Sequence, residues 1–297
     1  LRLQYRGSPT NLGETIRRRF LAVLSPGPPR PFRRGSGRRE LAEALVDPAR
    51  GGSLTARVIV NRVWRLHFGH GLVTTPSNFG FQGEAPSHPR LLDDLAARFI
   101  HAGWSLKWLH REIVLSATWR QSSDPDEHRT SIDPANRWLR RMNRRRLPVE
   151  AWRDAMLAVG DRLDHRLGGS PLRLSDQGNW RRTLYARIDR RDLDKMLRLY
   201  DFPDPTGHSP KREETTTPLQ QLFMLNSPFI TSQSAAVTRR VRANGDRVRA
   251  IGELYQLLFA RPPSAEEMEL ADEFLAEGSW PQYVQVLLAS NEFVFVD

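Results

Sequence analysis

The 297-residue chain contains no cysteine, and this absence excludes several classes of function from the chain itself. Without thiols it cannot form a disulfide framework, bind a metal through thiolates, use a cysteine nucleophile or attach haem covalently. Long apolar runs are also missing, because no window approaches the roughly 18 apolar residues of a membrane-spanning helix. Hydrophobic residues still make up 39% of the chain, which is typical of a folded globular protein.

Lysine is nearly absent as well, and this changes how the net charge of +11 is interpreted. Only Lys107, Lys195 and Lys211 occur among the 45 basic residues, and the other 42 are arginines. GC-rich codon usage alone would produce this ratio. Arginine runs at residues 17–19 and 144–146 could still attract phosphates or anionic surfaces. Solvated or salt-bridged arginines and polyanion binding therefore both stay open.

Proline and glycine are concentrated in residues 1–35, which predicts an extended linker with only a short helical piece near residues 14–24. We expect one helical domain over residues 36–297. The chain begins with Leu1 rather than Met, and no signal-peptide pattern follows, so we expect a piece of a longer polypeptide.

Apolar residues recur at helical spacing through most of the chain, which predicts a mainly α, multi-helix fold. Alternation at residues 183–188 predicts a small β-ribbon insertion within residues 170–190. We expect at least half of the residues in helix and fewer than about one in ten in strand. The predicted helices cover residues 36–46, 54–68, 89–102, 105–117, 134–142, 148–163, 192–200, 218–226, 228–241, 246–259, 264–276 and 280–292.

The helix at residues 54–68 is apolar over most of its surface, so it belongs in the middle of the fold. Its polar residues include Arg57, Asn61 and Arg62, which are candidate binding residues. Buried polar groups need hydrogen-bond partners. We therefore predict that Asn61 or Arg62 bonds to a neighbouring loop, the one at residues 74–88, and has a structural role.

Two long polar loops, residues 74–88 and 201–217, contain the residues most able to perform chemistry. A carboxylate with a nearby histidine can act in general acid–base catalysis. The candidate catalytic residues are Glu84, His88, Asp204 and His208. In the alternative interpretation the aspartates make turn hydrogen bonds beside prolines, and Glu84 pairs with an arginine.

The same loops supply the candidate binding residues Asn78, Gln82, Asp201 and Arg212. Most connections between helices need only about 4–6 residues, so these loops are longer than connection requires. We predict that they lie on the same side of the molecule and line its main polar concavity. Arg212 is expected to pair there with Glu84, Asp201 or Asp204, since guanidinium and carboxylate match bidentately. Alternatively, the loops are only irregular covers.

Other known site patterns are missing from the sequence. His67 and His70 lie on either side of Gly69, where a helix is expected to end, so a hydrogen-bonding role for His67 is favoured and no metal site is predicted. The sequence has no Walker motif, no G-x-G-x-x-G after a strand and no G-x-S-x-G. Most tryptophans sit at apolar helical positions, which makes binding of nucleic acid by stacking an unfavoured interpretation.

Several long stretches of the chain together form a recognisable pattern. They are residues 54–80 with the following QGEAPSHPRLLDDLAARFI, WSLKWLHREIVLSATWRQSS, NRRRLPVEAWRDAMLAVGDRLD, REETTTPLQQLFMLNSPF and the C-terminal RPPSAEEMELADEFL and LLASNEFVFVD. In these stretches the chain resembles a family of planctomycete-type C-terminal domains of unknown function, DUF1553, found in proteins with a cytochrome-c-like domain. The likeness covers nearly the whole chain from residue 7.

The resemblance implies an exported protein of the periplasm or cell envelope, with haem only in an upstream domain and no cofactor in this chain. It implies no reaction. Many relatives carry a cysteine in the loop after D-x-P-D-P, where this chain has TGHSPKREE, so no redox or metal role is expected there.

Three functions follow as hypotheses. The first is a non-catalytic binding or assembly domain whose partners are the upstream domains. The second is a hydrolase acting on an extracellular polymer through Glu84, Asp204 and His88 or His208. The third is a polyanion-binding module that uses the arginines.

Overall fold

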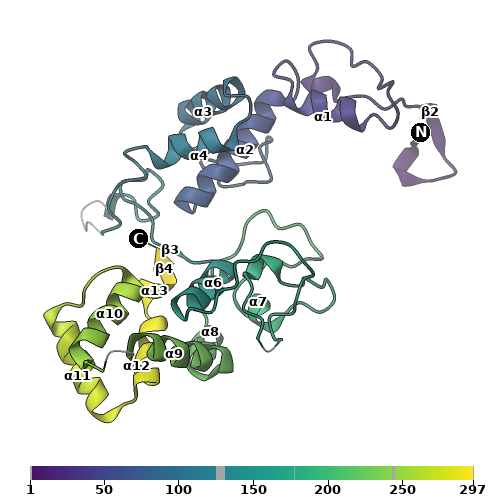
Figure 1. Ribbon diagram of the computed structural model, residues 1–297. Helices are drawn as coiled ribbons and strands as arrows, with labels where there is room; N and C mark the ends of the chain where they lie inside the picture. The colour runs from purple at the N-terminus through teal and green to yellow at the C-terminus, as the bar shows by residue number, and fades with distance from the viewer. Residues whose placement is uncertain (1, 125–130, 177, 243–244, 297) are drawn as a thin grey trace. The chain divides into compact units, whose positions relative to one another are not determined.

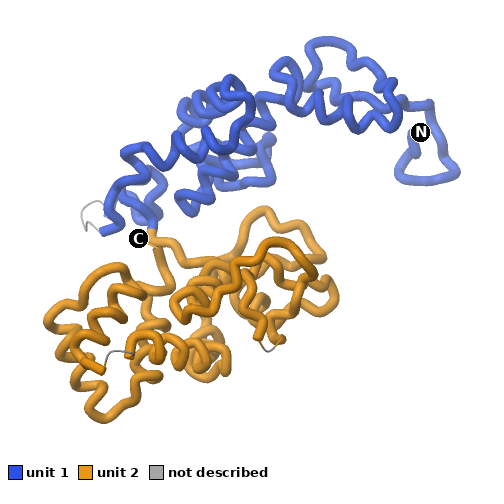
Figure 2. The backbone as a smooth tube through the Cα atoms, in the orientation of Figure 1, with its two compact units in different colours: residues 1–143 blue, residues 144–297 orange. Residues whose placement is uncertain are grey.

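The chain folds into two compact units (Figures 1 and 2). The structure, a computed structural model, describes residues 2–124, 131–176, 178–242 and 245–296. Unit 1 is Leu1–Asn143 and unit 2 is Arg144–Asp297, and each has its own cluster of buried apolar side chains. The division at residue 143 falls inside the range that the sequence analysis treats as one helical domain.

The fold class is mainly α, as predicted. The structure is 48% helical, just below the expected half, and the described residues form twelve α-helices and two small antiparallel sheets of two strands. No helix among the described residues is both long and apolar enough to cross a bilayer.

The start of unit 1 differs from the predicted extended linker. Strand β1 (Arg2–Gln4) pairs antiparallel with β2 (Leu12–Thr15), with the 3₁₀-helix η1 (Tyr5–Gly7) between them. The helical piece predicted near residues 14–24 is only the 3₁₀-helix η2 (Ala22–Leu24). Prolines that follow at residues 26, 28 and 29 cannot continue a helix, because each lacks an N–H donor.

The rest of unit 1 is built around one central helix. Helix α2 (Gly52–Phe68) packs against α1 (Arg38–Val46), α3 (Pro89–His101) and α4 (Leu106–Val114). Its buried side chains include Val60, Trp64 and Phe68, which join the core cluster with side chains of α3 and α4. The central position follows from the apolar surface of this helix, since a helix that is apolar on most sides must be covered on most sides.

Asn61 is the polar exception on α2, with 0% of its surface exposed. Its amide donates to the Val73 carbonyl at 3.0 Å and accepts from the Val73 N–H at 2.8 Å. A Cβ atom added at Gly71 would lie 2.7 Å from Asn61 Oδ1, which is too close for a non-bonded contact, so this position requires glycine. The predicted hydrogen bond is present, and its partner is one residue before the loop at residues 74–88. Arg62 is exposed.

His67 takes part in a chain of hydrogen bonds, as its sequence position suggested. The indole Nε1–H of Trp119 donates to His67 Nδ1 at 3.3 Å, and His67 Nε2 lies 2.8 Å from His110 Nδ1. Because an indole can only donate, His67 Nδ1 must accept, and His67 Nε2 then carries the proton and donates to His110. The imidazole ties the end of α2 to α4.

The helix predicted at residues 134–142 is wrong, because this segment forms a series of turns. Asn136 and Leu139 have φ angles of 46° and 51°, which no helix allows. The Asp133 carboxylate accepts the N–H groups of Arg137 and Trp138 at 3.0 and 2.8 Å, and these bonds replace those a helix would make.

Unit 2 begins and ends in one small sheet, in which β3 (Arg145–Arg146) pairs antiparallel with β4 (Phe295–Val296). The helix predicted at residues 280–292 is interrupted where Ser290 caps a new helix. The helices of the unit are α6 (Val149–Val159), η3 (Thr183–Tyr185), α7 (Lys195–Leu199), α8 (Pro218–Asn226), α9 (Pro228–Val241), α10 (Arg247–Phe259), α11 (Ala265–Glu277), α12 (Trp280–Leu288) and α13 (Asn291–Val294).

The described residues within 170–190, all but residue 177, do not form the predicted ribbon. They contain the 3₁₀-helix η3 and take part in two isolated parallel bridges, Asp164 with Arg181 and Leu172 with Ala186. The reason lies in the side chains of α6, because the Asp154 carboxylate accepts the N–H of Thr183 at 2.7 Å. A backbone donor held by a side chain is not available for a strand ladder.

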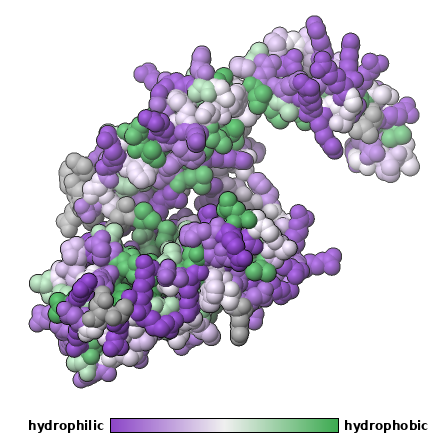
Figure 3. Space-filling view, in the orientation of Figure 1, coloured by the Kyte–Doolittle hydropathy of each residue, from purple (hydrophilic) through white to green (hydrophobic). Residues whose placement is uncertain are grey.

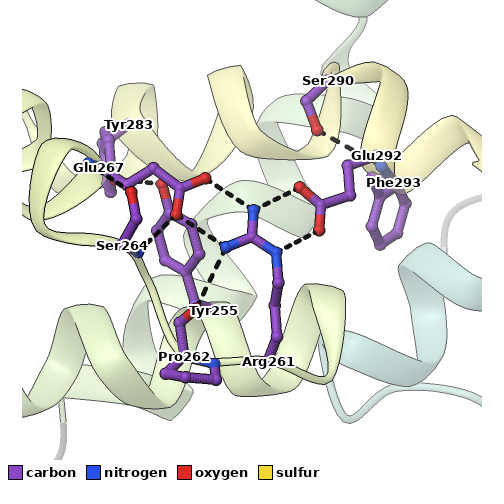
Figure 4. A network of polar contacts seen from close by, with 9 residues as sticks. All are labelled: Tyr255, Arg261, Pro262, Ser264, Glu267, Tyr283, Ser290, Glu292 and Phe293. Atoms are coloured by element: carbon purple, nitrogen blue, oxygen red, sulfur yellow. Dashed lines mark hydrogen bonds and ion pairs between the residues drawn. The ribbon is translucent and has the colours of Figure 1, made fainter. Parts of the chain in front are cut away.

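Arg261 follows α10 and joins it to α11 and α13, and all five of its N–H donors are used (Figure 4). It makes four hydrogen bonds of 2.7 Å, two to Glu267 and two to Glu292, and a fifth to the Pro262 carbonyl at 3.1 Å. Glu267 also completes the capping box with Ser264 at the start of α11. The hydrogen bonds from Arg261 lower the pKa of Glu267 from 4.5 to about 2.

The substitution Asn61→Ala should lower the free energy of unfolding by about 2 kcal/mol, because the Val73 N–H and carbonyl both lose their buried partner. Urea denaturation followed by tryptophan fluorescence measures this change. Arg62→Ala, at the exposed neighbouring position, is the control and should stay within about 0.5 kcal/mol of the parent. An unchanged unfolding curve for Asn61→Ala would refute the structural role.

Acid should weaken the Arg261 network. The folded pKa of Glu267 lies below its unfolded value, so its contribution to stability is present above about pH 4.5 and is lost as the pH falls toward 2. Between pH 6 and pH 2.5, the melting temperature of Glu267→Gln should therefore fall less than that of the parent. Glu266→Gln, at an exposed position in the same helical turn, should retain the parental pH dependence. An equal fall in melting temperature in Glu267→Gln and in the parent would contradict the role assigned to the Glu267 carboxylate.

Candidate binding cavity

Unit 2 contains a cavity of about 910 Å³, close to the upper end of the size range of pockets for small molecules. Its wall is formed by side chains of α6 and α7, by the chain at residues 173–176, 178–180 and 187–194, and by the first turns of α9. Phe223 of α8 and Phe229 of α9 contribute aromatic surface.

Arg153 on α6 is 1% exposed and holds the irregular part of this wall. Its two terminal nitrogens donate to the Arg181 carbonyl at 3.0 Å, the Thr183 hydroxyl at 3.1 Å and the Asn179 carbonyl at 2.6 Å. Burial lowers the pKa of Arg153, and the nearby carboxylates of Asp154 and Asp194 act in the opposite direction. One buried guanidinium thus fixes a segment that has no regular secondary structure of its own.

Two further contacts complete this support. The Thr183 hydroxyl donates to Asp154 Oδ1 at 2.7 Å, so it can accept from Arg153 at the same time. The Asn179 amide donates to the Arg173 carbonyl at 2.8 Å. The wall is therefore held by hydrogen bonds from side chains rather than by a strand ladder.

Gln233 on α9 lines the cavity and is 0% exposed. Neither Oε1 nor Nε2 of its amide has a hydrogen-bond partner among the described residues, and the same is true of Arg153 Nε. A Cβ at Gly160 would lie 3.1 Å from Gln233 Oε1, so glycine there leaves room for the amide. Phe229 lies one turn before Gln233 and on the same side of α9.

None of the eleven site residues proposed from the sequence lines this cavity. In unit 1, the Asn78 side chain accepts the Gly80 N–H at 3.0 Å, and His88 Nδ1 lies 3.0 Å from the Ser87 hydroxyl. Glu84 and Gln82 are exposed. Arg57 Nε lies 3.2 Å from Asp93 Oδ1.

Of the aspartates of the second loop, Asp204 makes the turn hydrogen bonds that the alternative interpretation described, and Asp201 bonds a residue near the other end of the loop. Asp201 accepts the N–H and the hydroxyl of Thr215 at 2.9 and 2.8 Å. Asp204 accepts the N–H and the hydroxyl of Thr206 at 2.8 and 2.7 Å, and these two bonds lower the pKa of Asp204. His208 is exposed.

The partner predicted for Arg212 is wrong. Arg212 makes a bidentate pair with Glu150 on α6, with both hydrogen bonds at 2.6 Å, and not with Glu84, Asp201 or Asp204. Burial opposes ionisation of Glu150, but the hydrogen bonds from Arg212 outweigh it, and the pKa of Glu150 is lowered. The pairing is bidentate as expected, and Arg212 joins the loop at residues 201–217 to the helix that carries Arg153.

Sequence reasoning missed Arg153 and Gln233. Arg153 directly follows Trp152 in a helix whose apolar face was recognised, and a charged residue beside that face is a weak signal of a buried site. Gln233 lies among the small polar residues of α9, where Ser234 and Thr238 are also buried. Those two hydroxyls donate to carbonyls one turn back, and the sequence does not distinguish them from an amide without a partner.

The model of the family described as "Protein of unknown function (DUF1553)" matches residues 37–275. The chain belongs to this family. The match includes residues from both units and every described residue of the cavity wall. No curated protein and no solved structure matches the chain at a significant level. In the part of the chain that the structure describes, no three His, Asp or Glu side chains are grouped so as to hold a metal ion.

Replacing Arg153 with Met should loosen the cavity wall. Two carbonyls and one hydroxyl lose their donor, which should lower the free energy of unfolding by about 3 kcal/mol. Amide hydrogen exchange of residues 179–183 should accelerate. Arg182→Met is the matched control, since Arg182 is exposed and its Nε is 3.8 Å from Asp154. Unchanged exchange in Arg153→Met would mean that the wall does not depend on this guanidinium.

Proposed function

We propose that this chain is a non-catalytic binding domain whose ligand occupies the cavity of unit 2. The observation that carries the proposal is the buried amide of Gln233, which belongs to a residue of the cavity lining and has no partner among the described residues. Leaving a buried polar group unpaired costs about 1–3 kcal/mol. An apolar side chain would avoid this cost, whereas a ligand that hydrogen-bonds the amide would offset it.

The hydrolase alternative has less support. A general acid must hold its proton near neutral pH, but the pKa of Asp204 is lowered and its carboxylate is engaged by Thr206. Asp201 is engaged by Thr215 in the same way.

The polyanion alternative also has less support. Hydrophilic residues cover much of the face shown in Figure 3. Many of the arginines, however, are already paired with carboxylates, among them Arg212 with Glu150, Arg166 with Asp164 and Arg261 with two glutamates. An arginine paired with a carboxylate has less charge to offer a phosphate or sulfate.

The sequence resemblance supports a wider setting for this binding domain. We propose that it is part of an exported planctomycete-type protein of the periplasm or cell envelope, with a haem-bearing cytochrome-c-like domain upstream. Its partners would be the upstream domains and an extracellular polymer. Fractionation of cells that produce the full-length protein tests this setting, and recovery only in the cytosol would overturn it.

Gln233→Leu should stabilise the protein and weaken ligand binding. Removing an unpaired buried amide should raise the free energy of unfolding by about 1 kcal/mol. Gln220→Leu is the matched control. Gln220 is also buried, but both its amide atoms have partners: Nε2 donates to the Leu199 carbonyl at 2.9 Å, and Oε1 accepts from Arg146 at 2.9 Å and from the Thr217 N–H at 3.2 Å.

The same substitution should therefore change stability in opposite directions at the two positions. Thermal unfolding of both variants measures this directly. If Gln233→Leu destabilises the protein as much as Gln220→Leu does, Gln233 is a structural residue and the proposed binding site loses its main support.

A further inference from the structure

We propose that the ligand of this cavity is a neutral peptide segment with an apolar side chain, recognised by Gln233 through its backbone amide. This inference rests on the proposed binding function and specifies the ligand class.

The charges around the cavity favour a neutral ligand. Four arginine or lysine residues and four aspartates line it, so the lining has no net formal charge. Two pairs neutralise each other directly, because Arg173 lies 3.3 Å from Asp192 and Arg187 lies 3.3 Å from Asp189. The remaining charged lining residues are Arg153, Lys195, Asp176 and Asp194.

Both remaining aspartates accept backbone hydrogen bonds. Asp194 accepts the Met196 N–H at 2.9 Å and caps α7, and Asp176 accepts the Arg173 N–H at 3.2 Å. A cationic ligand would therefore compete with bonds already made. An anionic ligand would find the Arg153 terminal nitrogens already bonded to the wall.

The unpaired groups match a peptide unit. A glutamine amide presents an acceptor and a donor in one plane, and a backbone amide presents the complementary N–H and C=O. Arg153 Nε supplies one further buried donor without a partner among the described residues, suited to a second carbonyl. The buried lining thus offers one acceptor group and two donor groups, which is the pattern of a short backbone segment.

The small number of unpaired hydrogen-bonding groups in the lining also disfavours an oligosaccharide as the ligand. A sugar carries a hydroxyl on most of its ring carbons, and each buried hydroxyl needs a partner. Most of the other polar groups in the lining are already bonded within the protein, such as the Ser232 hydroxyl, which accepts from Arg162 at 2.7 Å. Apolar lining residues would instead cover an apolar side chain of a peptide, and these are Leu174, Leu193, Met196, Phe223 and Phe229.

The test uses the full chain and three sets of probes, measured by isothermal titration calorimetry. The first is a library of tetrapeptides of neutral residues with acetylated N-termini and amidated C-termini. The second is a set of neutral oligosaccharides, and the third is polyphosphate and a sulfated polysaccharide. For the tightest peptide, each amide in turn is replaced by an ester, which removes one N–H.

We expect apolar peptides to bind the parent and Gln256→Leu equally, since Gln256 is exposed on α10 and lies outside the cavity lining. Gln233→Leu should weaken binding about tenfold or more. At one ester position the affinity of the peptide for the parent should fall by a similar factor, whereas its affinity for Gln233→Leu should not change. The reason is that the peptide N–H removed by the ester and the Gln233 amide removed by the substitution form the same hydrogen bond.

Two results would overturn the inference in different ways. If oligosaccharides or polyanions bind in a Gln233-dependent manner and the peptides do not, the binding function stands and the ligand class is wrong. If no probe binds the parent in a Gln233-dependent manner, the proposed function fails together with the ligand class.

Discussion

The buried guanidinium of Arg153 determines the shape of unit 2 around its cavity. The described residues of the irregular wall segment that it holds form no helix longer than a 3₁₀ turn and no strand ladder, so the carbonyls of Asn179 and Arg181 would otherwise be buried without donors. A planar group with several donors can satisfy carbonyls from two residues and a hydroxyl at once, which an ammonium cannot do with the same geometry. Irregular backbone can therefore surround a cavity and still be ordered.

Buried polar groups need hydrogen-bond partners, and this constraint also explains the other side-chain hydrogen bonds that join the elements of the structure. Asn61 satisfies the backbone of Val73 in unit 1, Gln220 joins α8 to α7, and Arg261 uses all five donors to join three helices. Gln233 departs from this rule while lining a cavity. Proteins that are otherwise consistent tend to depart from such rules at functional sites, and that is why the amide indicates a ligand.

Local sequence pattern was sufficient for the helices and for contacts between near neighbours. The apolar surface of residues 54–68 predicted a central helix. The need of its polar residues for partners predicted a hydrogen bond from Asn61 or Arg62, and Asn61 makes this bond to Val73, just before the predicted loop. The Ser264 and Glu267 capping box was also readable, because both partners lie within one turn. Errors occurred where side chains override backbone preference, as when Asp133 and Asp154 hold the N–H groups that a helix or ribbon would use.

The candidate site could not be predicted in the same way, because its contacts join distant parts of the chain. Arg212 and Glu150 are 62 residues apart, and Arg153 reaches carbonyls 26 and 28 residues away. The composition predicted a site in the long, charge-rich loops, whereas the unpaired amide of Gln233 lies on a regular helix. Nothing in the spacing of residues 228–241 distinguishes Gln233 from its satisfied neighbours.

The most direct test of the account is a crystal structure of the chain with the tightest-binding peptide. We expect the peptide in the unit 2 cavity, with a backbone N–H and C=O within about 3 Å of the Gln233 amide atoms and a further carbonyl near Arg153 Nε. A peptide bound elsewhere, or a Gln233 amide hydrogen-bonded to the protein itself, would contradict the account.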